Sequence, residues 1–233
     1  MLHTIVRSLP VVMLATTFTG VASTHAQVQT FTETFADGPA NWFDPTGAAP
    51  LTWEADGGAD GPGDGYVTTP FAFSEVPPLG SILARGQDEF NSSDNAFVGD
   101  WIDSQIEVFT FSIRHDAPAP VDVFVRFAQP DNSPGAIGIS FAPIVPNTWT
   151  EVAIPIDPNS PNLINFGGSD FDTIFSDIGH IQIGINAPDG FENDPTLYNF
   201  DFDSIGVVAI PAPGVLGLAA CLPLATGRRR RRG

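Results

Sequence analysis

Short segments in which apolar and polar residues alternate constrain this chain more than any other feature. In Ile106–Arg114 the alternation is strict from Phe109 onward, and glycine- and proline-rich turns separate such segments. A period of two places apolar side chains on one face of a half-buried strand. The other strand-like segments are Thr30–Phe35, Leu51–Ala55, Tyr66–Phe73, Ala96–Trp101, Val121–Phe127, Ala136–Phe141, Trp149–Ile156, His180–Asn186 and Tyr198–Val208.

About ten short strands at this spacing predict an all-β fold, with two antiparallel sheets packed as a sandwich. One helical turn is expected within 171–178, and no 11-residue amphipathic helix occurs. The sandwich is predicted to occupy residues 27–208. That length is sufficient for one domain with its own hydrophobic core.

The net charge of residues 27–208 limits the classes of partner that this domain can bind. All 27 acidic residues lie between Glu33 and Asp203, and with three arginines and no lysine they give a charge of −24. Nucleic acid and anionic lipid are excluded as partners, because a phosphate backbone needs cationic side chains. Acidic polysaccharide is disfavoured as a partner unless divalent cations bridge the polysaccharide and the acidic domain. The only cysteine, Cys221, lies outside the stretch, so no disulfide framework is expected.

Residues 1–26 have the three parts of a secretory signal peptide. Met1–Arg7 is short and basic, Leu9–Val21 is apolar, and Thr24 and Ala26 form a small-x-small site. Cleavage is therefore predicted after Ala26. The alternative, a buried N-terminal helix, is less consistent with so short an apolar run.

Residues 209–233 form a second tripartite segment. An apolar stretch, Val215–Thr226, lies between a proline motif and a basic block. A spanning helix needs about 20 apolar residues, and this length is reached only by counting from Ile205 through the prolines. A membrane anchor and a removable sorting signal both remain open. The motif is Pro211, Ala212, Pro213 and Gly214, and the block is Arg228, Arg229, Arg230, Arg231 and Arg232.

This order of proline motif, short apolar helix and terminal arginines resembles the PEP-CTERM sorting signal of exopolysaccharide-producing Gram-negative bacteria. The resemblance covers about the last 24 residues, and Ala212 replaces the family's glutamate. It implies a partner, the membrane protease exosortase, that cuts near the motif. It also implies export through the inner membrane to the cell surface, the outer membrane or the extracellular matrix, with membrane contact only through the tail before processing.

Several short segments of the domain resemble jelly-roll modules of the galactose-binding-like and carbohydrate-binding types. A further segment resembles laminin B-type sandwiches. The resemblance implies a two-sheet antiparallel jelly-roll sandwich, and function does not follow from that fold. The segments are Phe35–Gly38 with Trp42, Gly57–Val67 and Tyr198–Ile205 for the first types, and Asn95–Trp101 with a strand ending at His115 for laminin B.

Such jelly rolls imply a calcium ion that joins the first strand to the last. Residues that match are Glu33 and Asp37 near the first strand and Asp203 on the last, with Asp201 as an alternative to Asp203. Asp60 and Asp64 belong to a second acidic group, in which glycines separate the carboxylates. Carboxylates so spaced can surround Ca²⁺ with oxygen ligands, but Asp-Gly pairs also form ordinary turns.

The four tryptophans are candidates for stacking on a sugar ring. Trp53 and Trp149 lie in alternating segments and are predicted to be buried. Trp42 lies in an expected loop, and it is the predicted sugar-binding residue. Core packing is the alternative for all four.

Catalytic signatures are weak. The strand pattern Glu-x-Asp-x-x-Glu of jelly-roll glycosidases is absent, and no lysine is available as a lyase base. The sequence thus predicts a non-catalytic surface or matrix protein, in which a calcium-stabilised module binds polysaccharide or another protein. The alternative is a secreted hydrolase that acts on polysaccharide through an unrecognised site.

Overall fold

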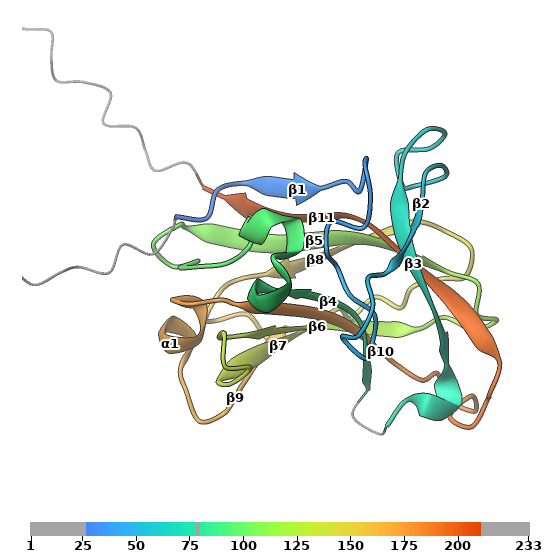
Figure 1. The fold of residues 1–233 in the computed structure, drawn as a ribbon. Helices are drawn as coiled ribbons and strands as arrows, with labels where there is room; N and C mark the ends of the chain where they lie inside the picture. The colour runs from blue at the N-terminus through green and yellow to red at the C-terminus, as the bar shows by residue number, and fades with distance from the viewer. Residues whose placement is uncertain (1–26, 78–79, 211–233) are drawn as a thin grey trace, which may run out of the picture.

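The computed structural model describes residues 27–77 and 80–210 as two antiparallel sheets packed face to face (Figure 1). The strands are β1 Phe31–Glu33, β2 Thr52–Glu54, β3 Tyr66–Ala72, β4 Ser81–Gln87, β5 Ile106–His115, β6 Asp122–Ala128, β7 Gly135–Ile139, β8 Thr150–Pro155, β9 Leu163–Phe166, β10 His180–Asn186 and β11 Leu197–Ala209. The helical turns are η1 Phe73–Glu75, η2 Asp88–Phe90, η3 Ser92–Asn95 and α1 Phe171–Phe175.

The last strand organises the larger sheet. This sheet has the order β2-β3-β11-β5-β8, and β1 also pairs with β11. β3 pairs with Leu197–Phe202, and β1 pairs with Ile205–Val207. Between these two stretches the register shifts at Asp203, and Ser204 takes a left-handed conformation with φ of 49°. Asp203 thus lies at the junction where the edge partner of β11 changes.

The smaller sheet has the order β4-β10-β6-β7-β9. Together the two sheets confirm the predicted all-β sandwich. β4 and β9 were not predicted from the sequence. In β4 the bulged residue Leu83 interrupts the period of two, because Ala84 pairs with Ile183 and Ile82 with Gly184. β9 has only four residues, too few for a clear alternation.

The predicted strand at Ala96–Trp101 is wrong. The segment follows η3 and turns, with the Val98 N–H donating to the Asn95 carbonyl at 3.0 Å. Its apolar side chains nevertheless reach the core, since Phe97 is 4% and Trp101 is 1% exposed. The apolar residues were therefore identified correctly, and the strand conformation was not. The predicted helical turn within 171–178 is confirmed as α1.

Aromatic side chains fill the space between the sheets. The Trp101 ring lies 5.5 Å from that of Phe127 and 5.9 Å from that of Phe175, measured between centroids. The Phe109 and Phe127 rings are 5.4 Å apart and nearly perpendicular. Each such pair adds about 0.5–1.5 kcal/mol beyond the burial of its area. The apolar halves of the alternating strands thus form one continuous core.

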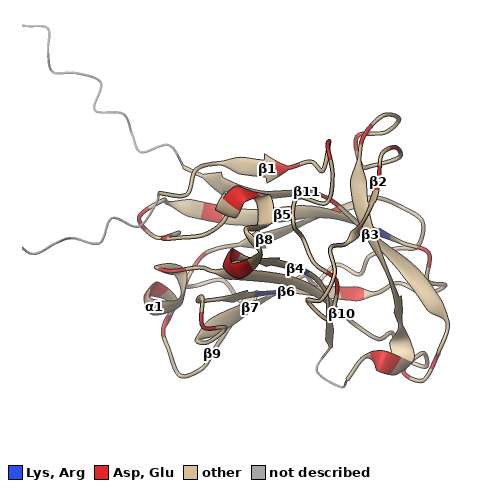
Figure 2. Ribbon diagram, viewed as in Figure 1, with Lys and Arg blue, Asp and Glu red and all other residues tan. Residues whose placement is uncertain are grey.

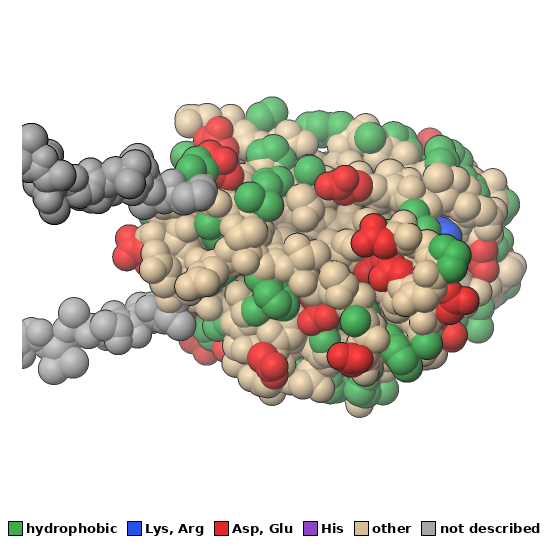
Figure 3. All heavy atoms as spheres, turned by 90° about the horizontal axis from the view of Figure 1, so that it is seen from above, with side chains coloured by type: hydrophobic (Ala, Val, Ile, Leu, Met, Phe, Trp, Pro, Cys, Tyr) green, Lys and Arg blue, Asp and Glu red, His purple; other side chains and the backbone are tan. Residues whose placement is uncertain are grey.

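Acidic residues lie mainly on loops and at strand ends, whereas the arginines lie within strands (Figure 2). The arginines are Arg85 on β4, Arg114 on β5 and Arg126 on β6. Seen from above, the acidic side chains form separate groups on the surface, and no basic patch is visible on that face (Figure 3). Across residues 27–77 and 80–210, no helix is long and apolar enough to cross a membrane.

Candidate ligand-binding pocket

Three neighbouring strands place polar side chains on the outer face of the larger sheet. Thr68 on β3, Asp201 on β11 and Arg114 on β5 are directly opposite one another in register. Their chain neighbours Phe202 and Ile113 are fully buried in the core. Because side chains alternate along a strand, this row points outward.

A pocket of about 460 Å³ opens over this row. Most of its lining side chains are charged or carry amide, hydroxyl or imidazole groups. They are Glu54, Tyr66, Thr68, Arg114, His115, Asp116, Asn147, Asn199 and Asp201.

Arg114 is held in place from every side. Its Nε and Nη2 each donate to Asp201 Oδ2 at 2.8 Å, and its Nη1 donates to the Gly57 carbonyl at 3.2 Å. The guanidinium lies against two rings, 5.1 Å from the Tyr66 centroid and 4.5 Å from that of Trp149, and the two rings also contact each other. Such stacking and forked hydrogen bonding are properties of arginine that lysine lacks. The centre of the pocket is therefore rigid.

The loop between β2 and β3 folds back over the same face. The Gly57 carbonyl accepts from Trp149 Nε1 at 3.1 Å as well as from Arg114, and the Ala59 N–H donates to Asp203 Oδ2 at 2.7 Å. This loop covers Asp203, which is fully buried although its side chain belongs to the outer face. The loop thus separates a closed acidic site from the open pocket.

Two atoms on pocket residues, Thr68 Oγ1 and His115 Nδ1, are buried and have no hydrogen-bond partner among the described residues. His115 is 1% exposed, and its Nε2 lies 2.9 Å from the Ile144 carbonyl. A carbonyl only accepts, so Nε2 carries the proton and Nδ1 is an acceptor. Burial lowers the pKa of His115, which keeps the ring neutral at pH 7. The pocket therefore offers one unused hydroxyl, that of Thr68, whereas the His115 ring points inward and stacks on the buried Phe200.

Beneath the loop, the carboxylates of Asp64 and Asp203 lie together. Burial and the adjacent Asp64 carboxylate raise the pKa of Asp203 to about 6. Asp203 Oδ1 also accepts from the Ser204 N–H at 2.6 Å. Both carboxylates press against Gly58, where an added Cβ would lie 2.8 Å from Asp203 Oδ2. This pair needs a proton or a cation to offset its mutual repulsion.

The five residues predicted to bind calcium do not form one cluster. Asp60 is exposed, and its backbone N–H donates to Asp64 Oδ2 at 2.8 Å. Glu33 and Asp37 line a separate pocket of about 340 Å³. In the described part of the chain, the one group of three or more potential ligands with atoms within 4.8 Å is Asp88, Glu89 and His180. Of the predicted set, only Asp64 and Asp203 meet.

The prediction that Trp42 is exposed and binds sugar is wrong. Trp42 is fully buried, its Nε1 donates to Ser93 Oγ at 2.9 Å, and its ring packs against the backbone of Gly86. The predicted burial of Trp53 and Trp149 is also wrong, because Trp53 is 36% exposed and Trp149 is half-buried beside Arg114. Trp53 pairs with the buried Val67, but it lies on the edge strand β2 and stays partly open to solvent, and Trp149 precedes β8.

Sequence reasoning did not identify the pocket. The sequence did contain an indication of the pocket. Arg114 is one of three arginines in residues 27–208, and it occupies an outward position on the strand with the clearest alternation. The sequence alone does not reveal that β5 pairs with β11, and this pairing brings Asp201 beside Arg114. The proline motif 211–214 and the arginine block 228–232 lie outside the described residues.

The outer face of the smaller sheet carries a second polar row. Arg85, Gln182 and Arg126 lie opposite one another on β4, β10 and β6. Arg126 Nη1 donates to Gln182 Oε1 at 2.8 Å, and its guanidinium lies 4.9 Å from the Phe166 centroid. These contacts satisfy part of the row internally, and Gln182 Nε2 is buried without a hydrogen-bond partner among the described residues.

No protein-family model and no curated protein matches the sequence. Solved structures of similar fold include the family 22 carbohydrate-binding module and GH10 part of a Clostridium thermocellum xylanase, crystallised with xylohexaose. That match has 12% identity and a TM-score of 0.47, and it covers 78% of this chain but only 28% of the xylanase chain.

Two further solved structures are similar to this chain. One is the family 11 carbohydrate-binding module of a Clostridium thermocellum cellulase, with 13% identity and a TM-score of 0.43, covering 79% of this chain and 97% of the module. The other is the L4b domain of human laminin α-2, with 15% identity and a TM-score of 0.36, covering 55% and 80%. At these identities the similarity concerns the fold alone.

Proposed function

We propose that this domain is a non-catalytic module that binds neutral carbohydrate in the pocket over β3, β11 and β5. The observation that carries the proposal is the buried, unpartnered hydroxyl oxygen of a pocket residue on the outer face of the sheet, Thr68 Oγ1. Sugars present hydroxyls that both donate and accept, which matches the unpartnered hydroxyl of Thr68. An unsatisfied buried polar atom costs about 1–3 kcal/mol, and a ligand that pairs with it recovers that cost.

The charges of the pocket support a neutral ligand. Glu54, Asp116 and Asp201 face a single arginine, and Asp201 already neutralises that arginine. A uronate or sulfate group would meet an excess of negative charge. Two amides, Asn147 and Asn199, add planar donors and acceptors of the kind that fix the orientation of a ligand in a polar site.

A glycan array of neutral and acidic oligosaccharides, with xylohexaose and mixed-linked β-1,3-1,4 tetrasaccharide among the probes, tests this proposal. Neutral glycans are expected to bind, and Thr68→Val is expected to weaken binding. The control Thr52→Val removes an exposed hydroxyl from the neighbouring strand and should have no effect. Loss of binding in Gln182→Ala alone would place the site on the other sheet. Release of shortened sugars by the wild type would favour a hydrolase instead.

We also propose that a divalent cation, Ca²⁺ in an extracellular setting, binds at Asp64 and Asp203 and stabilises the sandwich. The support is the buried Asp203 carboxylate beside that of the half-buried Asp64, a pair that contacts no cationic side chain among the described residues. Hard cations with oxygen ligands suit such a site. Backbone oxygens and water would have to complete the coordination.

Export and sorting form the third part of the proposal. The two predicted cleavage sites, after Ala26 and near the proline motif that begins at Pro211, lie just outside the residues that hydrogen-bond within the sandwich. The Val28 N–H donates to Ser104 Oγ at 2.8 Å, and the Ile210 N–H donates to the Gln105 carbonyl at 3.0 Å. Removal of 1–26 and of the segment from Pro211 onward would leave every described strand intact.

The mass of the protein recovered from the surface of its native cells tests this sorting. The expected species begins at Gln27 and ends near Pro211. Replacing the five arginines 228–232 with alanine should block release and leave the tail attached. Recovery of wild-type protein with an intact tail would contradict removal and favour a permanent anchor.

A further inference from the structure

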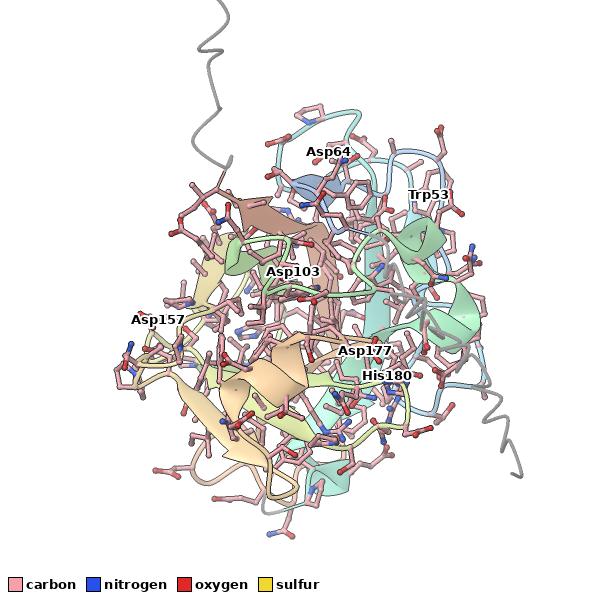
Figure 4. All side chains as sticks on the ribbon, turned by 90° about the vertical axis from the view of Figure 1, so that its left-hand side faces the viewer. Trp53, Asp64, Asp103, Asp157, Asp177 and His180 are labelled. Atoms are coloured by element: carbon pink, nitrogen blue, oxygen red, sulfur yellow. The ribbon has the colours of Figure 1, made fainter. Side chains whose placement is uncertain are left out.

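A second cluster of potential ligands lies at the edge of the smaller sheet, far from the Asp64 loop in Figure 4. His180 is the first residue of β10 and pairs with Gln87, the last residue of β4. η2 begins at the next residue, which places Asp88 and Glu89 beside the imidazole. The Asp88 N–H donates to the Gly179 carbonyl at 2.9 Å, so the turn is fixed to the strand that carries the histidine.

The hydrogen bonds of Asn132 determine which nitrogen of His180 carries the proton. Arg126 donates through Nη1 to Asn132 Oδ1 and through Nη2 to the Asn132 carbonyl. A guanidinium only donates, so the atom that it meets must be the amide oxygen. His180 Nδ1 lies 3.0 Å from that same oxygen, and it must therefore be the protonated nitrogen.

Gln87 is compatible with this tautomer. Its amide nitrogen lies 3.3 Å from His180 Nδ1, farther than the Asn132 oxygen. Rotation of the amide by half a turn presents its oxygen instead, and the contact then becomes a second acceptor for the same proton. His180 Nε2 is left with a lone pair in the neutral ring.

That lone pair faces two carboxylates. His180 Nε2 lies 2.8 Å from Glu89 Oε2 and 3.4 Å from Asp88 Oδ1. The nitrogen is buried and makes no hydrogen bond among the described residues, and His180 as a whole is 4% exposed. With a neutral ring these three acceptors repel one another, and either a proton on Nε2 or a bound cation relieves the repulsion.

We propose that His180, Asp88 and Glu89 form a site for a divalent first-row transition ion, for which Zn²⁺ is the probe. The ligand atoms all lie within 4.8 Å of one another, so small movements of the two carboxylates would bring every ligand to about 2.0–2.2 Å from one ion. The imidazole favours Zn²⁺ and related ions over Ca²⁺, which prefers oxygen ligands. The Nδ1 hydrogen bond to Asn132 is the outer contact that commonly orients a metal-bound histidine.

The site is open to an incoming ion. The Glu89 side chain is 51% exposed and that of Asp88 is 28% exposed, whereas that of His180 is 5% exposed. Two carboxylates would neutralise the charge of the ion, and water would complete its coordination. The histidine thus forms the fixed base of the site, and Glu89 closes it from the solvent side. This site is independent of the proposed sugar pocket.

Calorimetric titration of the full chain with Zn²⁺ tests the proposal. An excess of Ca²⁺ in the buffer occupies nonspecific carboxylates on the acidic surface. The wild type is expected to bind one Zn²⁺ per chain under these conditions, with a shift of the His180 ring signals in NMR. Glu89→Gln is expected to weaken binding at least about tenfold. Glu75→Gln is the control, because it changes an exposed glutamate in another short helical turn.

Glu89 is exposed, so its replacement should leave the fold intact even if a variant of His180 does not fold. Equal Zn²⁺ affinity in the wild type and Glu89→Gln would overturn the proposal. It would also be overturned by an absence of binding with His180 doubly protonated at neutral pH, since an imidazolium ion pair would then satisfy the cluster.

Discussion

Replacing Arg114 with alanine is expected to destabilise the domain by about 3–5 kcal/mol. The loss is large because Asp201, which is 9% exposed, would keep its charge without its partner. The Tyr66 and Trp149 rings would lose the cation that lies against both of them, and the Gly57 carbonyl would lose a donor. Chemical denaturation of the variant and the wild type measures the difference.

Three further variants determine which contact accounts for this loss. Arg114→Lys should recover only part of it, because an ammonium lacks the planar fork. Arg114→Ala combined with Asp201→Asn should be more stable than Arg114→Ala alone, since the buried charge is gone. Arg85→Ala is the control. It removes an arginine that donates to the Pro45 carbonyl without forming a described ion pair, and a cost of about 1 kcal/mol is expected. A cost of that size for Arg114→Ala would contradict its central role.

Asp64→Asn is expected to stabilise the domain at pH 7.5 in EDTA by about 1 kcal/mol, the opposite sign from most substitutions, because it removes the neighbouring carboxylate but leaves burial, the larger cause of the raised pKa of Asp203. The asparagine keeps an acceptor for the Asp60 N–H and presents a donor to Asp203 in place of a second carboxylate. In the wild type, the raised pKa of Asp203 means that the folded state holds a proton that the unfolded state has released between pH 4 and 6. The contribution of the Asp64–Asp203 pair to the free energy of unfolding is therefore present below pH 4 and is lost as the pH rises through about 6.

His115 has the opposite pH dependence. Burial lowers its pKa, so its contribution to stability is lost as the pH falls below the unfolded value. The contribution of His115 is the same in Asp64→Asn and in the wild type, so it cancels from the difference between their free energies of unfolding. That difference should be near zero at pH 4 and should grow up to pH 7.5.

The same two proteins test the calcium proposal. Millimolar Ca²⁺ should raise the melting temperature of the wild type at pH 7.5 and leave that of Asp64→Asn unchanged, since a ligand stabilises only the state that binds it. The control Asp189→Asn changes an exposed carboxylate in a distant turn and should respond like the wild type. An equal rise in all three proteins would assign the effect of Ca²⁺ to the acidic surface in general.

The sequence predicted the fold better than the site, for physical reasons. Alternation is local, so Phe109, Phe111 and Ile113 were sufficient to place β5 and its buried face. The pocket depends on register, which brings Asp201 opposite Arg114 from 87 residues away in the chain. Asp64 and Asp203 were predicted as cation ligands from spacing and resemblance, and their meeting depends on a loop that folds over the sheet.

Trp42 illustrates the opposite error. A tryptophan between turn residues suggested an exposed loop, but that loop crosses the edge of the sandwich, and its side chain enters the core against Gly86. Composition alone cannot distinguish such a loop from a surface loop, because the difference depends on what the loop packs against.

The affinity of Thr68→Val for the best neutral oligosaccharide from the array, compared with that of the wild type, tests the central claim most directly. Valine has nearly the same shape as threonine and removes a buried hydroxyl that has no described partner. The melting temperature is therefore expected to stay equal or rise, while the affinity falls about tenfold, as expected for one unsatisfied hydrogen bond. Unchanged affinity at unchanged stability would contradict the assignment of this pocket as the carbohydrate site.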